Sequence, residues 1–254
     1  MVRQHLAKKH VGEKEGFRWR SHEISRFEGL SDAVFGFAIT LLIVSLEVPH
    51  TFDELLETMR GFGAFAICFA LLIAIWYKQY IYFRRYGLED TQTILLNSVL
   101  LFVVLFYVYP LKFLFSLLFN SWLGLPTDVH LPDGRMVPPI RQDQLPLLMI
   151  IYSLGFAAAS LVFIFLYRHA WKKRVELELN ELERLDTRAS VFESAISLGV
   201  GAASVSLAAL GGAKLVGWAG WIYPVLLAPA QTFSGMYFGR QRRKVWERMR
   251  VAAD

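Results

Sequence analysis

The stretch RFEGLSDAVFGFAITLLIV, residues Arg26–Val44, is the most informative part of the chain. It starts with the charged residues Arg26, Glu28 and Asp32 and continues as a mainly apolar run of the kind that crosses a bilayer. A charged side chain inside a membrane is costly and generally faces the protein interior. The position of Asp32 therefore raises the question of which partner it meets.

The composition of the whole chain is that of a helical membrane protein. Hydrophobic residues make up 55% and aromatic residues 15% of its 254 residues, and the mean hydropathy is +0.38. Several apolar segments approach or exceed the roughly 20 residues that a helix needs to cross a bilayer. The single cysteine, Cys68, excludes an intrachain disulfide. We therefore predict an all-α polytopic membrane protein.

Six segments are expected to span the membrane, and prolines help to delimit them. They are predicted at 30–48, 62–83, 93–119, 145–167, 189–210 and 215–238. Pro49 ends the first helix, and Pro224 and Pro229 are expected to kink the sixth.

These spans divide the chain into a transmembrane domain and two tails. We predict a basic N-terminal tail at 1–29, the six-helix domain at 30–239 and a basic C-terminal tail at 240–254. Within the domain, the proline-rich segment 120–144 is predicted as an external loop. The charged segment 168–188 is predicted as a cytoplasmic extension of the fourth helix.

The distribution of Lys and Arg predicts the orientation of the chain. Of the 27 such residues, 22 lie in the two tails or next to the turns that follow the second and fourth spans. The other side keeps only Arg60, Lys112, Arg135, Arg141 and Lys214. Because cytoplasmic loops carry an excess of positive charge, both termini are predicted to be cytoplasmic, in a multi-pass protein of the cell membrane. Membrane topology also accounts for the net charge of +5 without a nucleic-acid partner.

Sequence motifs for catalysis and for cofactor binding are absent. The chain has no HExxH, no GxSxG, no P-loop and no paired Cys/His spacing for a metal. Its six histidines fall in the predicted tails and loops. It also lacks the TVGYG filter of pore-loop potassium channels. We therefore expect neither enzymatic activity nor a cofactor.

A helical wheel of the first span separates an apolar stripe from Asp32. With about 100° per residue, Leu41 and Val44 fall within about 40° of Phe37, with Thr40 beside them, and Asp32 falls on nearly the opposite face. Such a stripe fits ordinary helix packing. It also fits a hydrophobic constriction that gates a pore by dewetting.

The depth of Asp32 limits its candidate partners. It lies about 240° from Arg26 around the helix, so these two residues cannot pair as i,i+4 neighbours. Trp76 and Gln79 at the end of the second span, and Asn97 at the start of the third, are expected at the same depth. We predict a buried polar cluster that joins the three helices. The alternative is an unpaired Asp32 that reaches the membrane interface.

The segment RFEGLSD followed by AVFGFAITLLIV resembles the RxxxFSD signature and first helix of the transmembrane protein 175 family. The resemblance extends through WYKQYIYFRRY and LLNSVLLFVVLFYVYP, and it covers about residues 26–115. Members are potassium-permeable channels, and the prokaryotic ones carry a single six-helix repeat, as this chain is expected to do. The resemblance implies a homotetramer in the lipid bilayer, in which the first helix surrounds a central pore for monovalent cations.

The resemblance also implies roles for the stripe. Phe37 matches the narrowest hydrophobic position of the family, and Leu41 and Val44 match further pore-lining positions. Thr40 matches the threonine linked to a preference for K⁺ over Na⁺. Relatives carry Ile or Leu at the narrowest position, so four Phe37 rings would either plug the pore more tightly or offer ring faces to a dehydrated cation.

A structural cluster that holds the first helix in place is implied as well. It comprises Arg26, Ser31, Asp32, Trp76, Gln79 and Asn97. The chain departs from the family at Leu30, where the signature has Phe, and at Gln79 and Tyr80, where a His-His pair is common. Because Gln79 and Tyr80 stand where the histidine pair is common, a titratable contact is lost.

The function predicted from these features is a passive, potassium-permeable cation channel with weak selectivity for K⁺ over Na⁺. A secondary cation- or proton-coupled transporter is the main alternative. It would need a site built from Glu193 with Ser190, Ser194 and Ser197, although the small residues of this helix also fit close helix packing. A non-conducting membrane scaffold is the third class.

Overall fold

A bundle of long helices forms the molecule, and the computed structural model describes residues 17–21, 23–44, 50–124, 129–130 and 136–251. In chain order the elements are α2 (Arg26–Val44), α3 (Phe52–Tyr86), α4 (Thr91–Trp122), β1 (Val129–His130), β2 (Met136–Val137), α5 (Leu145–Lys172), α6 (Glu181–Ile222), the π-helical segment η1 (Tyr223–Leu227) and α7 (Ala228–Val251). The two short strands pair antiparallel in the loop after α4. The predicted all-α fold is confirmed.

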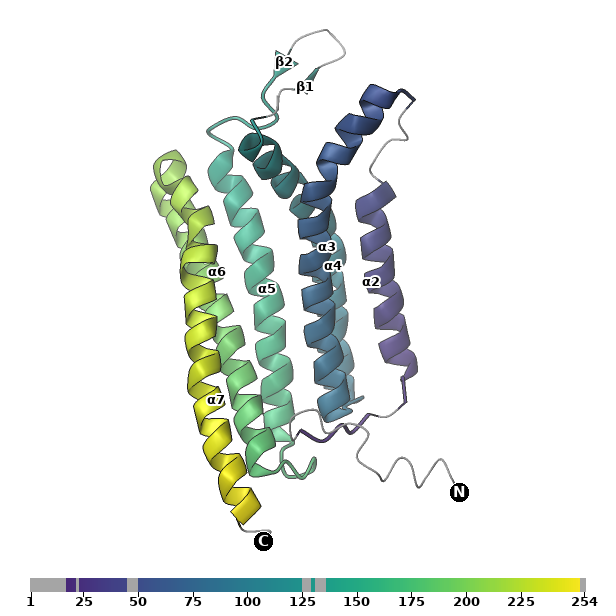
Figure 1. Ribbon diagram of the computed structural model, residues 1–254, viewed down its shortest axis with the longest axis vertical. Coiled ribbons are helices and arrows are strands. Elements are labelled where there is room, and N and C mark those ends of the chain that lie inside the picture. The colour runs from purple at the N-terminus through teal and green to yellow at the C-terminus, as the bar shows by residue number, and fades with distance from the viewer. Residues whose placement is uncertain (1–16, 22, 45–49, 125–128, 131–135, 252–254) are drawn as a thin grey trace.

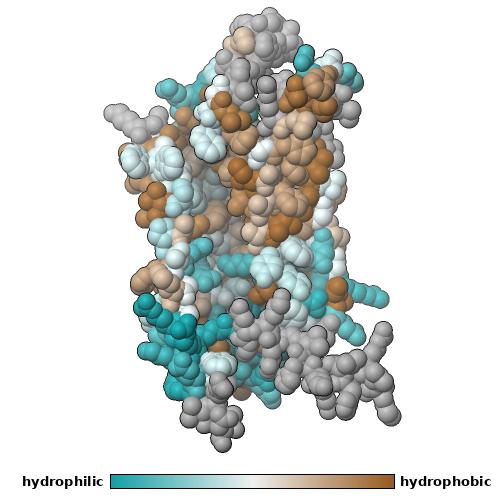
Figure 2. Space-filling model, in the orientation of Figure 1, coloured by the Kyte–Doolittle hydropathy of each residue, from teal (hydrophilic) through white to brown (hydrophobic). Residues whose placement is uncertain are grey.

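Helices that follow one another in the chain pack side by side, and α2 contacts both α3 and α4. Figure 1 shows α2 at one edge of the bundle and α6 with α7 at the other. The described N-terminal residues and the end of α7 lie at the same end of the molecule (Figure 1). Hydrophilic residues gather at this end, whereas apolar residues cover the middle and upper part of the same face (Figure 2).

Four helical segments of the described chain are long and apolar enough to cross a membrane. They are Gly61–Tyr86, Thr91–Trp122, Leu145–Lys172 and Glu181–Gly212. The first predicted span corresponds to α2, which begins with charged residues and is described as far as Val44; residues 45–49, with the predicted end of this span, lie outside the described part. The sixth predicted span is divided between the end of α6, η1 and the start of α7.

Gly212 interrupts α6 between the fifth and the sixth predicted span. Its backbone has φ 51° and ψ −146°, a conformation in which an L side chain would be strained. Near this glycine the chain turns back, so that the Ser204 hydroxyl donates to the carbonyl of Ala219 at 2.8 Å. The distortion expected at Pro224 is present as η1, because proline lacks the N–H that a regular helical turn needs.

The predicted extension at 168–188 is wrong, because the chain reverses inside it. Helix α5 ends at Lys172 and α6 begins at Glu181. Asn180 accepts a hydrogen bond from the N–H of Glu183, whose carboxylate accepts one from the N–H of Asn180. This capping box starts a new helix. Helix α7 runs to Val251 through the segment predicted as the C-terminal tail, and α4 runs to Trp122, so the loop predicted at 120–144 begins only after Trp122.

The described residues before α2, at 17–21 and 23–25 of the predicted N-terminal tail, form a strap that packs against the bundle. The ring of Phe17 is 1% exposed and meets the ring of Tyr86 edge to face, with 5.7 Å between centroids. Arg20 donates from its side chain to the carbonyls of Leu177 and Arg85. The residues just before α2 therefore connect it to the last turn of α3 and to the chain between α5 and α6.

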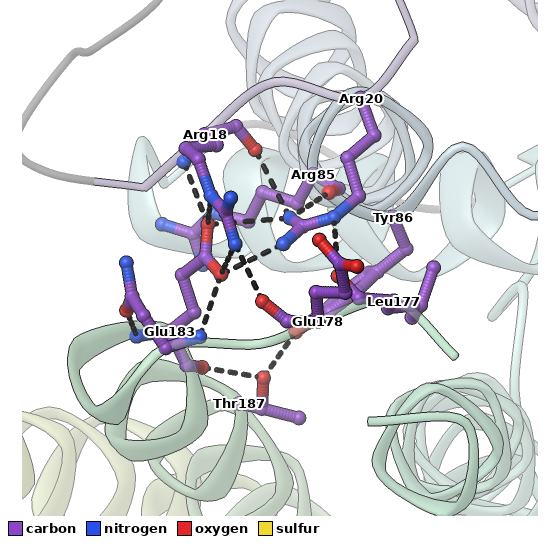
Figure 3. A network of polar contacts seen from close by, with 9 residues as sticks. Arg18, Arg20, Arg85, Tyr86, Leu177, Glu178, Glu183 and Thr187 are labelled. Carbon is purple, nitrogen blue, oxygen red and sulfur yellow. Dashed lines mark hydrogen bonds and ion pairs between the residues drawn. The ribbon is translucent and has the colours of Figure 1, made fainter. Parts of the chain in front are cut away.

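The carboxylate of Glu183 closes this connection (Figure 3). Its side chain has no exposed surface, and it lies 2.7 Å from Nη2 of Arg20 and 3.3 Å from Nε of Arg18. The backbone N–H of Arg18 donates to it as well, at 2.9 Å. A buried carboxylate is tolerated only with such partners, because an unpaired buried charge is strongly destabilising.

Asp90 forms a second polar junction, between α4 and α5. Its side chain caps α4 by accepting from the N–H of Thr93 at 2.8 Å. Its Oδ2 lies 2.6 Å from Nε2 of His169 and 3.1 Å from Nζ of Lys173. Burial alone would raise the pKa of Asp90, but the hydrogen bonds from Thr93, His169 and Lys173 outweigh it and hold this pKa well below its usual value of 3.8. The prediction that every histidine lies in a tail or loop is wrong for His169, which is buried in α5.

Replacing Glu183 tests the strap. We expect Glu183→Ala to lower the free energy of unfolding by about 1.5–3 kcal/mol, because two partly exposed arginines lose charge-assisted hydrogen bonds to their buried partner. Denaturant titration in detergent micelles measures this. Glu181→Ala is the matched control: Glu181 is 58% exposed and pairs with Arg248, which is 68% exposed, so we expect about 1 kcal/mol or less. Equal effects of the two substitutions would contradict the assignment.

Replacing Asp90 tests the junction through its pH dependence. Since the folded pKa is depressed, the ionised carboxylate stabilises the fold above its usual pKa, and this contribution is lost as the pH falls below about 4. Asp90→Asn keeps the helix cap. The difference in thermal unfolding midpoint between wild type and Asp90→Asn should therefore be steady from about pH 7 to about pH 5 and shrink below about pH 4.

The control for Asp90 is Asp143→Asn, because Asp143 is 70% exposed and pairs with the equally exposed Arg141. An exposed pair of this kind contributes little. We expect a small difference at every pH. A wild-type advantage over Asp90→Asn that stays constant down to about pH 3 would contradict the depressed pKa.

Candidate functional site: the exposed face of α2

One face of α2 is packed against the rest of the bundle. Phe35, Ala38 and Leu42 are 2%, 0% and 0% exposed and belong to a core cluster with Cys68 and Val104 of α3 and α4. They recur at intervals of three and four residues, which places them on one side of a helix. This helix is therefore held by a single face.

The opposite face of α2 has no packing partner among the described residues. Phe37 is 58% exposed and Ile43 is 49% exposed, and Thr40 between them is also exposed. Leu41 is half-buried and packs against the core cluster of α2, α3 and α4, at the edge of the exposed face. Val44 ends α2, and its side chain lies outside the described residues.

The exposed face is thus centred near Thr40, between Phe37 and Ile43, and not on the predicted line from Phe37 through Leu41. Ile43 belongs to it and was missed. Three residues beyond Thr40 correspond to about 300°, which brings Ile43 to the far side of Thr40 from Phe37. The helical wheel would have predicted that Ile43 is exposed if Phe35, Ala38 and Leu42 had first been identified as the buried face.

Thr40 presents an oxygen on this apolar surface. Its hydroxyl donates to the carbonyl of Gly36, four residues earlier, at 2.9 Å. The single proton of the hydroxyl is used within the helix, so its lone pairs remain available to an outside donor or cation. The exposed face therefore combines bulky apolar side chains with one hydrogen-bond acceptor.

Buried hydrogen bonds fix α2 to its neighbours near the basic end of the bundle. Asn97 of α4 has no exposed surface; its amide nitrogen donates to the hydroxyl of Ser31 at 2.8 Å, and its oxygen accepts from Gln79 of α3 at 2.5 Å. Ser31 and Gln79 are 1% and 2% exposed, and Ser31 donates to the carbonyl of Phe27 at 3.0 Å. One continuous network thus joins α2, α3 and α4.

Asp32 is paired next to this network, but it is not buried. The indole Nε1–H of Trp76 donates to its Oδ1 at 2.8 Å. The alternative of an unpaired Asp32 is therefore wrong. Tyr80, where the family commonly has a histidine, stacks on Trp76 with 5.6 Å between ring centroids. Arg26 is exposed at the start of α2 and, within the described chain, joins neither set of contacts.

Lys112 of α4 holds the other end of α2 and was missed as a functional residue. Its Nζ donates to the carbonyl of Leu42 at 3.0 Å. This carbonyl lies in the last turn of α2, and a cation is favourable at a helix C-terminus. The sequence could have indicated this role, because Lys112 is a lone lysine inside the apolar segment YPLKFLF, and a charge inside a membrane span needs a partner.

The three serines of the alternative transporter site lie in α6. Ser190, Ser194 and Ser197 each donate to the carbonyl four residues earlier in their own helix. Lys78, which we expected next to a turn, lies within α3, donates to Ser194 at 3.0 Å and stands 4.9 Å from the centre of the Phe163 ring. Among the residues described, His, Cys, Asp and Glu form no group that could hold a metal ion.

Comparisons with known proteins converge on one family. The model of the family described as "Endosomal/lysosomal potassium channel TMEM175" matches residues 26–107. A potassium channel from Marivirga tractuosa is 44% identical over 190 residues, which are 75% of this chain and 76% of that protein. A potassium channel from Chamaesiphon minutus is 28% identical over 156 residues, which are 58% of this chain and 66% of that protein.

A solved structure gives the same result. It is the crystal structure of a threonine-to-alanine variant of the potassium channel MtTMEM175 in complex with a nanobody fusion protein. It matches with a TM-score of 0.76 and 38% identity, over 92% of this chain and 100% of that chain. The extent and identity of these matches show that the chain belongs to the TMEM175 family of potassium channels.

Proposed function

We propose that the protein is a passive, K⁺-permeable cation channel of the cell membrane, a homotetramer with α2 around a central pore. One observation carries the proposal: α2 lies at an edge of the bundle and leaves Phe37 and Thr40 exposed, in a chain whose relatives are named potassium channels. Four copies of a helix that is packed on one face only can enclose a path with the other face. The exposed surface of α2 would then be buried by assembly.

The barrier in this pore would be hydrophobic. The four Phe37 side chains, with those of Leu41 and Val44 further along the pore, would form a constriction. Such a constriction excludes water when it is narrow. The Thr40 oxygen, with its proton donated to Gly36, would replace part of the hydration shell of a cation. A ring of four hydroxyls is a weaker and more flexible cage than stacked rings of carbonyls, so we expect only weak selectivity for K⁺ over Na⁺.

The orientation follows from the charges. Basic residues concentrate in the N-terminal strap, at the junction of α5 with α6 and in α7, and the described parts of both termini lie at this end (Figure 1). The positive-inside rule assigns this end to the cytoplasm. Asp32 and the Asn97 network would then stand at the cytoplasmic side of the pore, and Lys112 at the external side.

Reconstitution separates a channel from its alternatives. We expect K⁺ current through planar bilayers that contain the purified protein, and a particle mass in detergent that corresponds to four chains. Uptake of cations against their gradient, driven by a second ion, would identify a transporter. If no current flows at any voltage, a non-conducting scaffold is the remaining interpretation. A particle mass of one chain would contradict the tetrameric pore.

Thr40→Ala tests the role of the hydroxyl ring. We expect the permeability ratio of K⁺ to Na⁺ to fall toward one, because the acceptor oxygens are removed and the apolar walls stay. Reversal potentials in mixed-ion bilayers measure the ratio. Thr232→Ala in α7 is the matched control: this exposed threonine makes the same hydrogen bond four residues back, at 2.8 Å, and should leave the ratio unchanged.

Phe37→Leu tests the constriction. Leucine is smaller than phenylalanine, so four copies would leave a wider constriction, and water would enter it at a lower free-energy cost. We therefore expect larger single-channel conductance with little change in selectivity. Phe102→Leu in α4, at a site 69% exposed, is the control for a general effect of losing an exposed ring. A lower conductance in Phe37→Leu would instead show that ring faces assist the passage of cations.

A further inference from the structure

We propose that the groove between α5, α6 and α7 at the basic end of the bundle binds an anionic phospholipid. The groove is an open one with a volume of about 780 Å³. Its walls include Ile164, Arg168, Trp171, Arg188, Phe192 and Phe238. This inference rests on the chain spanning a membrane and does not require that it conducts ions.

The two arginines of the groove lie near the junction of α5 with α6, and apolar lining residues continue from them toward the middle of the bundle. Arg168 lies within the last turn and a half of α5, and Arg188 lies about two turns into α6, so both are near the junction of these helices. Ile164, Phe192 and Ala195 lie further from that junction, toward the middle of the bundle. A head group placed on the arginines therefore has an apolar wall for an acyl chain on the side toward the middle of the bundle.

Both groove arginines have unused hydrogen-bonding capacity. Within the described chain, no hydrogen bond or ion pair engages the guanidinium of Arg168 or Arg188, and that of Arg188 lies 4.6 Å from the centre of the Trp171 ring. A guanidinium stacked on an aromatic ring keeps the N–H groups at its edge available. By contrast, Arg174 donates to the carbonyl of Trp171, and Arg248 pairs with Glu181.

A phosphodiester fits these free groups better than other partners do. Guanidinium binds phosphate oxygens through paired, charge-assisted hydrogen bonds. The cytoplasmic leaflet supplies anionic lipids at the depth where the arginines would lie. The groove also lies at the edge of the bundle opposite α2 (Figure 1), which in the proposed tetramer faces the bilayer and not a neighbouring copy.

Native mass spectrometry of the full chain in detergent, titrated with dioleoyl-phosphatidylglycerol, tests the proposal. We expect Arg168→Gln combined with Arg188→Gln to weaken retention of this lipid by at least about tenfold, since charge-assisted hydrogen bonds are lost. Arg240→Gln combined with Arg243→Gln removes the same charge from exposed positions of α7 that do not line the groove, and it should leave retention unchanged. Dioleoyl-phosphatidylcholine should bind the wild type weakly.

A second variant keeps the charges and fills the groove. Ala195→Trp should displace the acyl chain and weaken phosphatidylglycerol retention even if the double arginine variant folds poorly. Equal retention by the groove and control variants, or equal binding of the two lipids, would overturn the proposal. A change of particle mass in the groove variants would also overturn it, because a second copy of the chain would then occupy the groove. None of these measurements depends on current.

Discussion

The buried hydrogen bonds from Ser31 through Asn97 to Gln79 set the rotation of α2, and the exposed face depends on that rotation. Asn97 has no exposed surface, so turning Ser31 away would leave an amide unsatisfied among apolar helices, which is costly. Thr40 follows Ser31 by about two and a half helical turns and therefore lies on the opposite side of α2. A polar contact on one face thus determines which side chains the other face presents.

Three further attachments fix α2 at both ends while leaving its outer face free. Trp76 holds Asp32 at the basic end, and Lys112 holds the carbonyl of Leu42 at the other. The strap before α2 is tied to α6 through Glu183. Because all of these contacts lie at the ends or on the inner side, they define the position of α2 without covering Phe37 or Thr40. In the proposed channel, the walls of the pore would be positioned by groups that never touch the permeant ion.

Sequence reasoning found the parts of this arrangement that periodicity and depth determine. Matching depths along antiparallel helices identified Trp76 and Asn97 as neighbours of α2, and the wheel separated Asp32 from Phe37. The wheel gives only relative angles, so it could not place Leu41 at the edge of the core. The break at Gly212 depends on a single left-handed backbone conformation, which composition does not reveal. The capping box of Asn180 was readable as N-E-L-E, but opposite charges at helical spacing over 168–188 also suit one continuous helix, and that interpretation concealed the turn.

The chemistry of the proposed pore follows from where the proton of Thr40 goes. A hydroxyl that donated outward would repel a cation, whereas donation to Gly36 turns its lone pairs toward the exposed side. This oxygen carries no net charge, so it leaves the surrounding surface apolar and does not hold a cation tightly. A cation at this level would lose part of its hydration beside Phe37 and recover part of that loss from neutral oxygens one turn away. Weak compensation next to a hydrophobic barrier gives passage without a binding site deep enough to trap the ion, and that balance is what a channel without a carbonyl filter requires.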